Sequence, residues 1–254
     1  MTRNRTTFPA PVVERADDNA TYDIDEFYMG PTRIAAADKV ELSYNKMQSV
    51  LYDLVQKLSE DVGNWMLYNW RATAATSQVR TSGGAADAHL SGGTGHRKKV
   101  LAADLQAASL AMREAKIPND EWYALLDPTM HDQLLSDLKF GEFRDTIKEA
   151  DLSRGFIGKL FNLNIIQRHT VLGYTNAATP VPNAPGAANA NQNAAALCWS
   201  KGMVERALGE IDFYEELKSA TYFGDLYSGL IRSGGRKRRY DGVGVVAIIE
   251  TGID

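Results

Sequence analysis

The stretch 40–70 constrains the fold of this chain more than any other part of the sequence, because it predicts one long amphipathic helix. Apolar residues recur there every three or four positions, and polar residues lie mostly on the other faces. The apolar positions are Met47, Leu51, Leu54, Leu58, Val62 and Trp65. At about 1.5 Å per residue the helix is about 45 Å long, so several separate parts of the molecule must cover its apolar stripe. Gly63 lies inside the helix and predicts a bend or a close backbone neighbour.

The segment before this helix, residues 1–39, predicts an extended arm. It contains apolar and aromatic residues without a sustained period, and Pro9, Pro11 and Pro31 exclude a regular helix. Nearly forty residues without structure are improbable inside a compact domain. We therefore expect the arm to lie on the body of its own chain or on a neighbouring copy.

Residues 71–99 are rich in Ala, Ser, Thr and Gly and predict one or two strands with mobile connections. Their last part, 92–99, combines glycines with His96, Arg97, Lys98 and Lys99. No apolar strand precedes it, and the spacing GxxxxGK[ST] is absent. The sequence thus disfavours a phosphate-binding loop.

Residues 101–138 predict a unit with its own core. An amphipathic helix at 101–115 is followed by a short strand at 122–126. Asp127 then has the position of an N-cap, with Pro128 at the first position of a helix that continues through Leu138. Helix, strand and capped helix in this order indicate an α+β layer.

The second half of the chain predicts mainly strands. We expect a half-buried edge strand at 163–168. A segment rich in Ala, Asn and Pro, 174–196, predicts a surface loop, and a further strand is expected at 195–199. The C-terminus predicts an antiparallel sheet. Its strands are expected at 225–232, 236–240 and 243–249, with turns at 233–235 and 241–242.

Composition and residue spacing exclude several classes of protein. The net charge of −4 argues against a protein that coats nucleic acid with a generally basic surface. No signal peptide or membrane-spanning apolar run is present. The only cysteine, Cys198, lies in an apolar strand and is expected to be a buried structural thiol, which suits the cytosol.

Catalytic, cofactor-binding and metal-binding motifs are absent as well. The histidines, expected on the surface or in loops, do not have metal-ligand spacing. They are His89, His96, His131 and His169. No serine lies in a nucleophile elbow, and no GxGxxG opens a helix. We therefore predict no catalytic residues, no cofactor and no metal.

Two clusters of opposite charge predict an inter-subunit contact. Between positions 14 and 26, six acidic residues against Arg15 alone give a net charge of −5, and a corner near the C-terminus carries +5. The acidic residues are Glu14, Asp17, Asp18, Asp23, Asp25 and Glu26, and the basic ones are Arg232, Arg236, Lys237, Arg238 and Arg239. The clusters are expected to meet across a subunit boundary and direct register. Alternatively, the acidic stretch is a solvated loop, or the basic corner faces packaged DNA.

The order of these parts resembles a tailed-bacteriophage major capsid protein of the Hong Kong 97 type. The resemblance covers nearly the whole chain and rests on the extended arm before a long helix, on Ile117-Pro118 and Asp127-Pro128 in the unit 101–138, and on the C-terminal tail from Gly224-Asp225 through Asp241-Gly242-Val243. It implies an α+β fold with a spine helix, a peripheral domain, an axial domain, an N-arm and an extended loop. The implied boundaries are 1–39 for the arm and loop, 40–99 and 218–254 for the peripheral domain, and 100–217 for the axial domain.

The implied function is structural. Copies of the chain would assemble as hexamers and pentamers into an icosahedral shell around double-stranded DNA, without sequence specificity, in the virion, after assembly in the cytoplasm of the host bacterium. A portal and separate scaffolding or decoration proteins are the implied partners, and no membrane is involved. Residues 1–38 contain no lysine, so we predict no isopeptide crosslink from the extended loop.

Two alternatives stay open. An encapsulin-like bacterial nanocompartment shares this fold and a similar length, and a protein cargo instead of DNA would distinguish it. A nucleic-acid-binding protein of another class is favoured only by the basic runs 96–99 and 236–239. The sequence offers no site for an enzyme.

Overall fold

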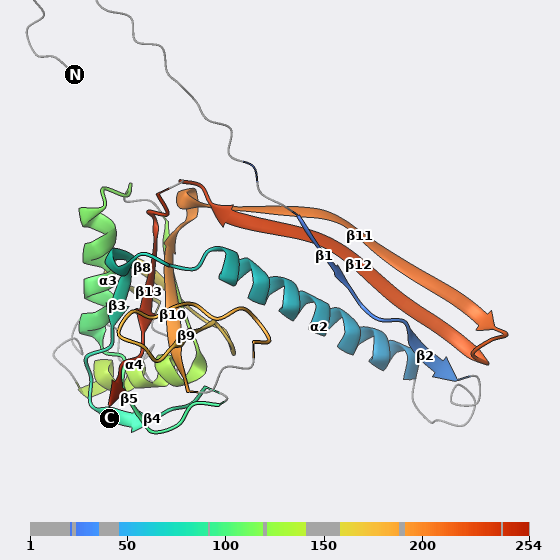
Figure 1. Ribbon diagram of the computed structural model, residues 1–254, viewed down its shortest axis with the longest axis horizontal. Coiled ribbons are helices and arrows are strands. Elements are labelled where there is room, and N and C mark those ends of the chain that lie inside the picture. The colour runs from blue at the N-terminus through green and yellow to red at the C-terminus, as the bar shows by residue number, and fades with distance from the viewer. Residues whose placement is uncertain are drawn as a thin grey trace, which may run out of the picture.

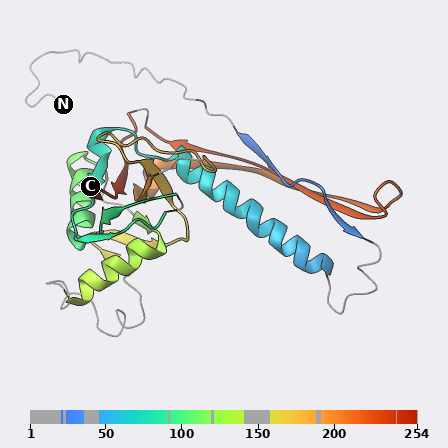
Figure 2. The same ribbon diagram turned by 60° about the horizontal axis from the view of Figure 1, so that its bottom comes forward.

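The molecule combines an α/β body with a long, narrow extension (Figure 1). The computed structural model describes residues 21, 24–35, 46–90, 92–118, 121–140, 158–187, 191–239 and 241–253. The extension consists of one helix and one sheet that run side by side away from the body, as both views show (Figures 1 and 2). Within the described residues, no helix has the length and apolar character needed to span a membrane.

The body is built on a seven-stranded mixed sheet with the order β3-β13-β10-β6-β8-β7, in which β9 also pairs with β10. The strands are β3 (Gln78–Arg80), β6 (Trp122–Leu126), β7 (Lys159–Leu160), β8 (Leu163–Gln167), β9 (Leu172–Thr175), β10 (Gln192–Ser200) and β13 (Val245–Ile249). β3 is parallel to β13 and β8 is parallel to β6, whereas the other pairs are antiparallel.

Both faces of this sheet are buried. Helices α3 (Ala102–Glu114) and α4 (Pro128–Phe140) pack on one face, where Ala196 and Cys198 of β10 contribute to the core. The other face, with Ala195 and Leu197, packs against the end of the long helix, β9 and the segment before it. Since neighbouring residues of a strand point to opposite faces, the continuous apolar run in β10 follows directly from this burial on two sides.

The extension contains a four-stranded sheet and the long helix α2 (Lys46–Asn69). Its strands are β1 (Asp25–Tyr28), β2 (Thr32–Ala35), β11 (Val204–Ser219) and β12 (Gly224–Lys237). β12 pairs with β11 on one side and with β1 and then β2 on the other. The described part of the expected arm therefore lies on its own chain.

A small three-stranded sheet and two short 3-10 helices complete the described fold. The sheet has the order β14-β5-β4. Its strands are β4 (Ala85–Asp87), β5 (His96–Lys98) and β14 (Gly252–Ile253), and the 3-10 helices are η1 (Ala75–Ser77) and η3 (Lys201–Met203). Residues 71–99 thus form three short strands instead of the one or two expected.

The long helix is confirmed over Lys46–Asn69, and the expected start at 40–45 and the Met47 side chain lie outside the described residues. A Cβ atom on Gly63 would lie 2.9 Å from Nη2 of Arg168. The same guanidinium donates hydrogen bonds to Oδ1 of Asn64 at 2.7 Å and to the carbonyl of Glu60 at 3.2 Å. The close neighbour of Gly63 is therefore a side chain that joins α2 to the body, not a backbone.

The unit 101–138 is confirmed. α3, β6 and α4 have nearly the predicted bounds, and the N–H of Met130 donates to Oδ1 of Asp127 at 2.7 Å. This is the geometry of an N-cap, with Pro128 as the first helical residue. β8 is confirmed as a strand, but it pairs on both sides and is not an edge.

The prediction for the C-terminal sheet is wrong at the turn 233–235. β12 continues through it as one strand that pairs with β11 over nearly its whole length. Gly235 serves close packing instead of a turn, because a Cβ atom there would overlap Sδ of Met66. The strand expected next to it, β13, instead pairs with β10 and β3 in the body.

The predicted surface loop 174–196 is wrong at both ends. Tyr174 is fully buried in β9, and its hydroxyl donates to the carbonyl of Ala72 at 2.9 Å. Asn193 and Ala194 are also buried, because β9 and the start of β10 pair with each other. Only 176–187 and the residues between it and β10 are left to connect the two strands. Ala194, Ala195 and Ala196, whose small side chains are typical of a loop composition, are instead packed between two layers.

Candidate assembly surfaces

The outer strand of the extension, β11, presents a free edge with exposed apolar side chains. β12 pairs along one side of β11, and within the described residues no strand pairs along the other. Along β11, five large apolar side chains are about half exposed or more. They are Leu208, Ile211, Phe213, Tyr214 and Leu217. A long free edge with apolar side chains is a typical surface for contact with another chain.

An apolar groove separates β11 from helix α2. It has a volume of about 270 Å³. It is lined by Met29, Val55, Leu58, Ser59, Val62, Leu208, Ile211, Asp212, Phe213, Gly229 and Ile231. Val55 is 53% exposed, and Leu58 and Val62 are only half-buried. The apolar stripe of α2, which the sequence predicts to be covered, is thus left partly open by the part of the chain that the structure describes.

The basic residues singled out in the sequence have partners within the chain. Nη2 of Arg232 lies 2.6 Å from Oε1 of Glu26, directly opposite on β1. Nε of Arg236 lies 3.2 Å and Nε of Arg238 3.6 Å from the carboxylate of Glu205. The remaining two pair with a carbonyl or a nearby acid.

Those two are Lys237, whose Nζ donates to the carbonyl of Arg71 at 3.1 Å, and Arg239, which pairs with Asp241. Burial lowers the pKa of Lys237. Of the acidic set, Asp25 lies on β1 opposite Ser233, whereas Glu14, Asp17, Asp18 and Asp23 lie outside the described residues. A contact of these clusters across subunits stays a prediction, and the structure adds a contact between Glu26 and Arg232 within one chain.

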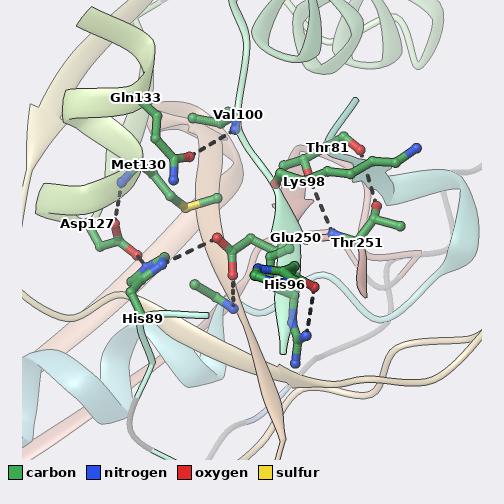
Figure 3. Close-up of polar contacts among 12 residues, drawn as sticks. Thr81, His89, His96, Lys98, Val100, Asp127, Met130, Gln133, Glu250 and Thr251 are labelled. Carbon is green, nitrogen blue, oxygen red and sulfur yellow. Dashed lines mark hydrogen bonds and ion pairs between the residues drawn. The ribbon is translucent and has the colours of Figure 1, made fainter. Parts of the chain in front are cut away.

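A second cluster, which the sequence reasoning missed, joins His89 to two buried carboxylates in the body (Figure 3). Nε2 of His89 lies 2.7 Å from Oδ2 of Asp127, and Nδ1 lies 3.4 Å from Oε1 of Glu250. His89 is in a loop, as expected, but its side chain is only 19% exposed. No local pattern could reveal the cluster, because its members come from three separate parts of the chain.

This polar cluster borders a cavity of about 450 Å³. Its lining includes Leu90, Thr129, His169 and Gln192 besides His89 and Asp127. Among the described residues, no group of three or more His, Cys, Asp or Glu side chains has the arrangement to hold a metal ion. Cys198 is fully buried, as predicted, and burial raises the pKa of its thiol to about 12.

The sequence matches no protein-family model and no curated protein. The fold, in contrast, matches solved structures over nearly the whole chain. The capsid structure of the cyanophage P-SCSP1u has a TM-score of 0.63 at 16% identity, covering 97% of this chain and 80% of that chain. The head structure of the Helicobacter pylori bacteriophage KHP40 has a TM-score of 0.62 at 13% identity, covering 91% and 75%.

A virus-like particle from Pyrococcus furiosus also matches, with a TM-score of 0.50 at 12% identity, covering 89% of this chain and 76% of that chain. The resemblance to phage capsid proteins inferred from the sequence is thereby confirmed at the level of the fold. The chain has a mixed fold, dominated by sheets and with few helices, that is similar to the folds of phage capsid proteins.

Proposed function

We propose that this chain is the major capsid protein of a tailed bacteriophage and that its copies assemble into the icosahedral shell around the double-stranded DNA. The observation that supports this most is the match to capsid structures over more than nine-tenths of the chain. The open apolar groove and the free edge of β11 add to it, because both are surfaces that the described residues of the chain leave uncovered. On this proposal the chain is not an enzyme.

The two parts of the molecule correspond, on this proposal, to the domains of a Hong Kong 97-type subunit. The extension, with α2 as the spine helix and the hairpin of β11 and β12, is the peripheral domain, and the body is the axial domain. Residues 71–99 and 241–253 then belong with the body, because β3 and β13 are strands of its sheet. The boundaries expected from the sequence placed both segments in the peripheral domain.

The partner of the groove and of the β11 edge is a second copy of this chain. The groove lining is mostly apolar, and an apolar surface of this kind is stabilised by contact with another apolar surface. The free backbone groups of β11 offer hydrogen bonds to an added strand. On this proposal the copies form hexamers and pentamers of the shell, with a portal and scaffolding or decoration proteins as further partners. The shell assembles in the host cytoplasm and is part of the virion.

A shell that encloses a protein cargo is the second candidate, because the resemblance inferred from the sequence leaves an encapsulin-like compartment open. The fold also matches a virus-like particle from Pyrococcus furiosus. The two shells differ in content, not in fold. Nuclease-resistant double-stranded DNA inside particles from infected or induced cells indicates a phage capsid. A co-purifying protein inside particles without DNA indicates a compartment.

The proposal is tested by sedimentation and negative-stain microscopy of the purified chain, alone and with the products of neighbouring genes that encode candidate scaffolds. We expect closed shells or rings of five and six subunits. A chain that stays monomeric at high concentration in every combination would contradict a shell function. A monomer alone that assembles when a scaffold is added would support it.

A further inference from the structure

Three segments of the body meet at one histidine. His89 lies in the connection between β4 and β5, Asp127 directly before α4, and Glu250 directly after β13. Figure 3 shows the imidazole between the two carboxylates. The side chains of Asp127 and Glu250 are only 7% and 2% exposed. Both carboxylates that His89 contacts are therefore largely shielded from water.

Each carboxylate already uses its other oxygen. Oδ1 of Asp127 accepts from the N–H of Met130 at 2.7 Å, and Oε2 of Glu250 accepts from the N–H of Ala194 at 3.2 Å. An ionised carboxylate only accepts hydrogen bonds. Nε2 of His89 therefore faces an acceptor oxygen at hydrogen-bond distance, whereas Nδ1 makes no hydrogen bond but lies within ion-pair distance of the other carboxylate. An imidazole with a proton on each nitrogen matches this arrangement of two acceptors.

The balance of charge agrees with this protonation state. Arg97 is the other cation of the cluster, only 1% exposed, and its guanidinium donates to the carbonyls of Thr94 and His96 at 3.0 Å and to Asn191. Its charge acts on Glu250 from a distance. Two cations then balance Asp127 and Glu250. A neutral His89 would leave a net negative charge in a buried site, which is costly.

We propose that doubly protonated His89 is a clamp that holds the loop 88–90 against the start of α4 and the end of β13, and that loss of one proton releases this loop. The loop forms one wall of the 450 Å³ cavity through His89 and Leu90, so its release opens that cavity. His169, on the same cavity, pairs with Glu60 at 2.8 Å in an exposed contact and is not part of the clamp. The clamp is a property of the folded chain and does not depend on the proposed function.

The direction of the pH dependence follows from two shifts. Burial by itself lowers the pKa of His89, but the hydrogen bond and charge of Asp127 and the charge of Glu250 outweigh it, so the pKa lies above its ordinary value of 6.5. The clamp is therefore complete below about pH 6.5 and is lost as the pH rises through the folded-state pKa. Burial raises the pKa of Glu250, and this shift has the same sign: stability falls as the pH rises through the raised folded-state pKa.

The test is nitrogen-15 NMR of the histidine side chains in the full chain, combined with amide hydrogen exchange at residues 88–90 between pH 6 and 9. At pH 6 we expect both ring nitrogens of His89 to be protonated. Above its pKa, exchange at 88–90, corrected for the intrinsic effect of pH, should accelerate by up to about tenfold per pH unit. His89→Gln should remove this acceleration.

His96→Gln is the matched control, since His96 pairs with Asp87 at 3.0 Å while both side chains are largely exposed. It should leave the pH dependence at 88–90 unchanged. Glu250→Gln keeps the side-chain volume and should move the transition of His89 to lower pH. A neutral His89 at pH 6, or parallel exchange profiles for the wild type and His89→Gln, would overturn the clamp.

Discussion

Single residues in this chain often serve the tertiary structure in a way that their local sequence does not reveal. Gly63 reads as a weak point in a helix, but it makes room for the guanidinium of Arg168. That guanidinium is half-buried, and burial lowers its pKa. Asp127 reads as an N-cap and is one, but it also receives His89 on its second oxygen. One side chain thus stabilises α4 and a distant loop together.

The thiol of Cys198 is predicted to be inert in the folded protein. Its pKa of about 12 leaves a thiolate fraction of about one in ten thousand at pH 8, and the sulfur is fully buried as well. Ellman's reagent at pH 8 should therefore find no reactive thiol in the native chain and one per chain in concentrated guanidinium chloride. Rapid labelling of the native chain would show that β10 opens locally.

At the scale of elements, the extension depends on β12, because β1, β2 and β11 all pair with this strand. Cross-strand pairs and close backbone contacts hold it, because the apolar stripe of α2 covers only part of the sheet. The exposed pair of Glu26 and Arg232 contributes at most about 1 kcal/mol. Close packing at glycines therefore matters more to this sheet than its surface charges.

Gly224→Ala is predicted to detach β2. Gly224 lies opposite Ala35, and a Cβ atom there would overlap the carbonyl oxygen of Ile34, which is backbone and has little freedom to move. We expect a loss of about 1–3 kcal/mol in the free energy of unfolding, measured in urea, and faster amide exchange at 32–35.

Gly30→Ala is the matched control, since nothing lies within 4 Å of a Cβ atom at that position. It should change stability by less than about 0.5 kcal/mol. Equal effects of the two variants would show that conformational freedom, not close packing, is the role of Gly224.

At the scale of the whole molecule, the body and the extension differ in how well the described residues cover their apolar side chains. The body buries both faces of its sheet. The extension keeps large apolar side chains exposed along β11 and at the tip of the hairpin, where Phe223 is 76% exposed. This asymmetry is expected of a subunit whose extension is completed by its neighbours.

Ile211→Asp is predicted to prevent assembly without unfolding the chain. Ile211 is 64% exposed and lines the groove, so the substitution places a charge in the proposed contact at little cost to the monomer. We expect an unchanged thermal midpoint and at least a tenfold higher concentration for assembly, measured by light scattering.

Glu210→Gln, at the exposed neighbouring position of β11, should assemble like the wild type and serves as the control. Normal shells from Ile211→Asp would exclude this part of the groove from the subunit contact. The effect of the substitution on assembly and its effect on the fold are separated by measuring the thermal midpoint in the same samples.

The sequence by itself determined the elements that depend on neighbouring residues: α2 from its apolar period, α3 from the same signal, and α4 from the cap at Asp127. The order of these elements was also enough to indicate the resemblance to capsid proteins. Each of these signals lies within a few positions along the chain, where local sterics and hydrogen bonding decide the conformation.

Only the tertiary structure decided which strands share a sheet, that Gly235 allows close packing against Met66, and where His89 lies. β13 joins β10 and not β12, and Glu250 reaches His89 only because of that pairing. Such contacts join positions far apart in the chain, and their energy depends on how the layers pack rather than on any nearby pattern. The same holds for the groove beside β11, which exists because two separate elements converge without closing on each other.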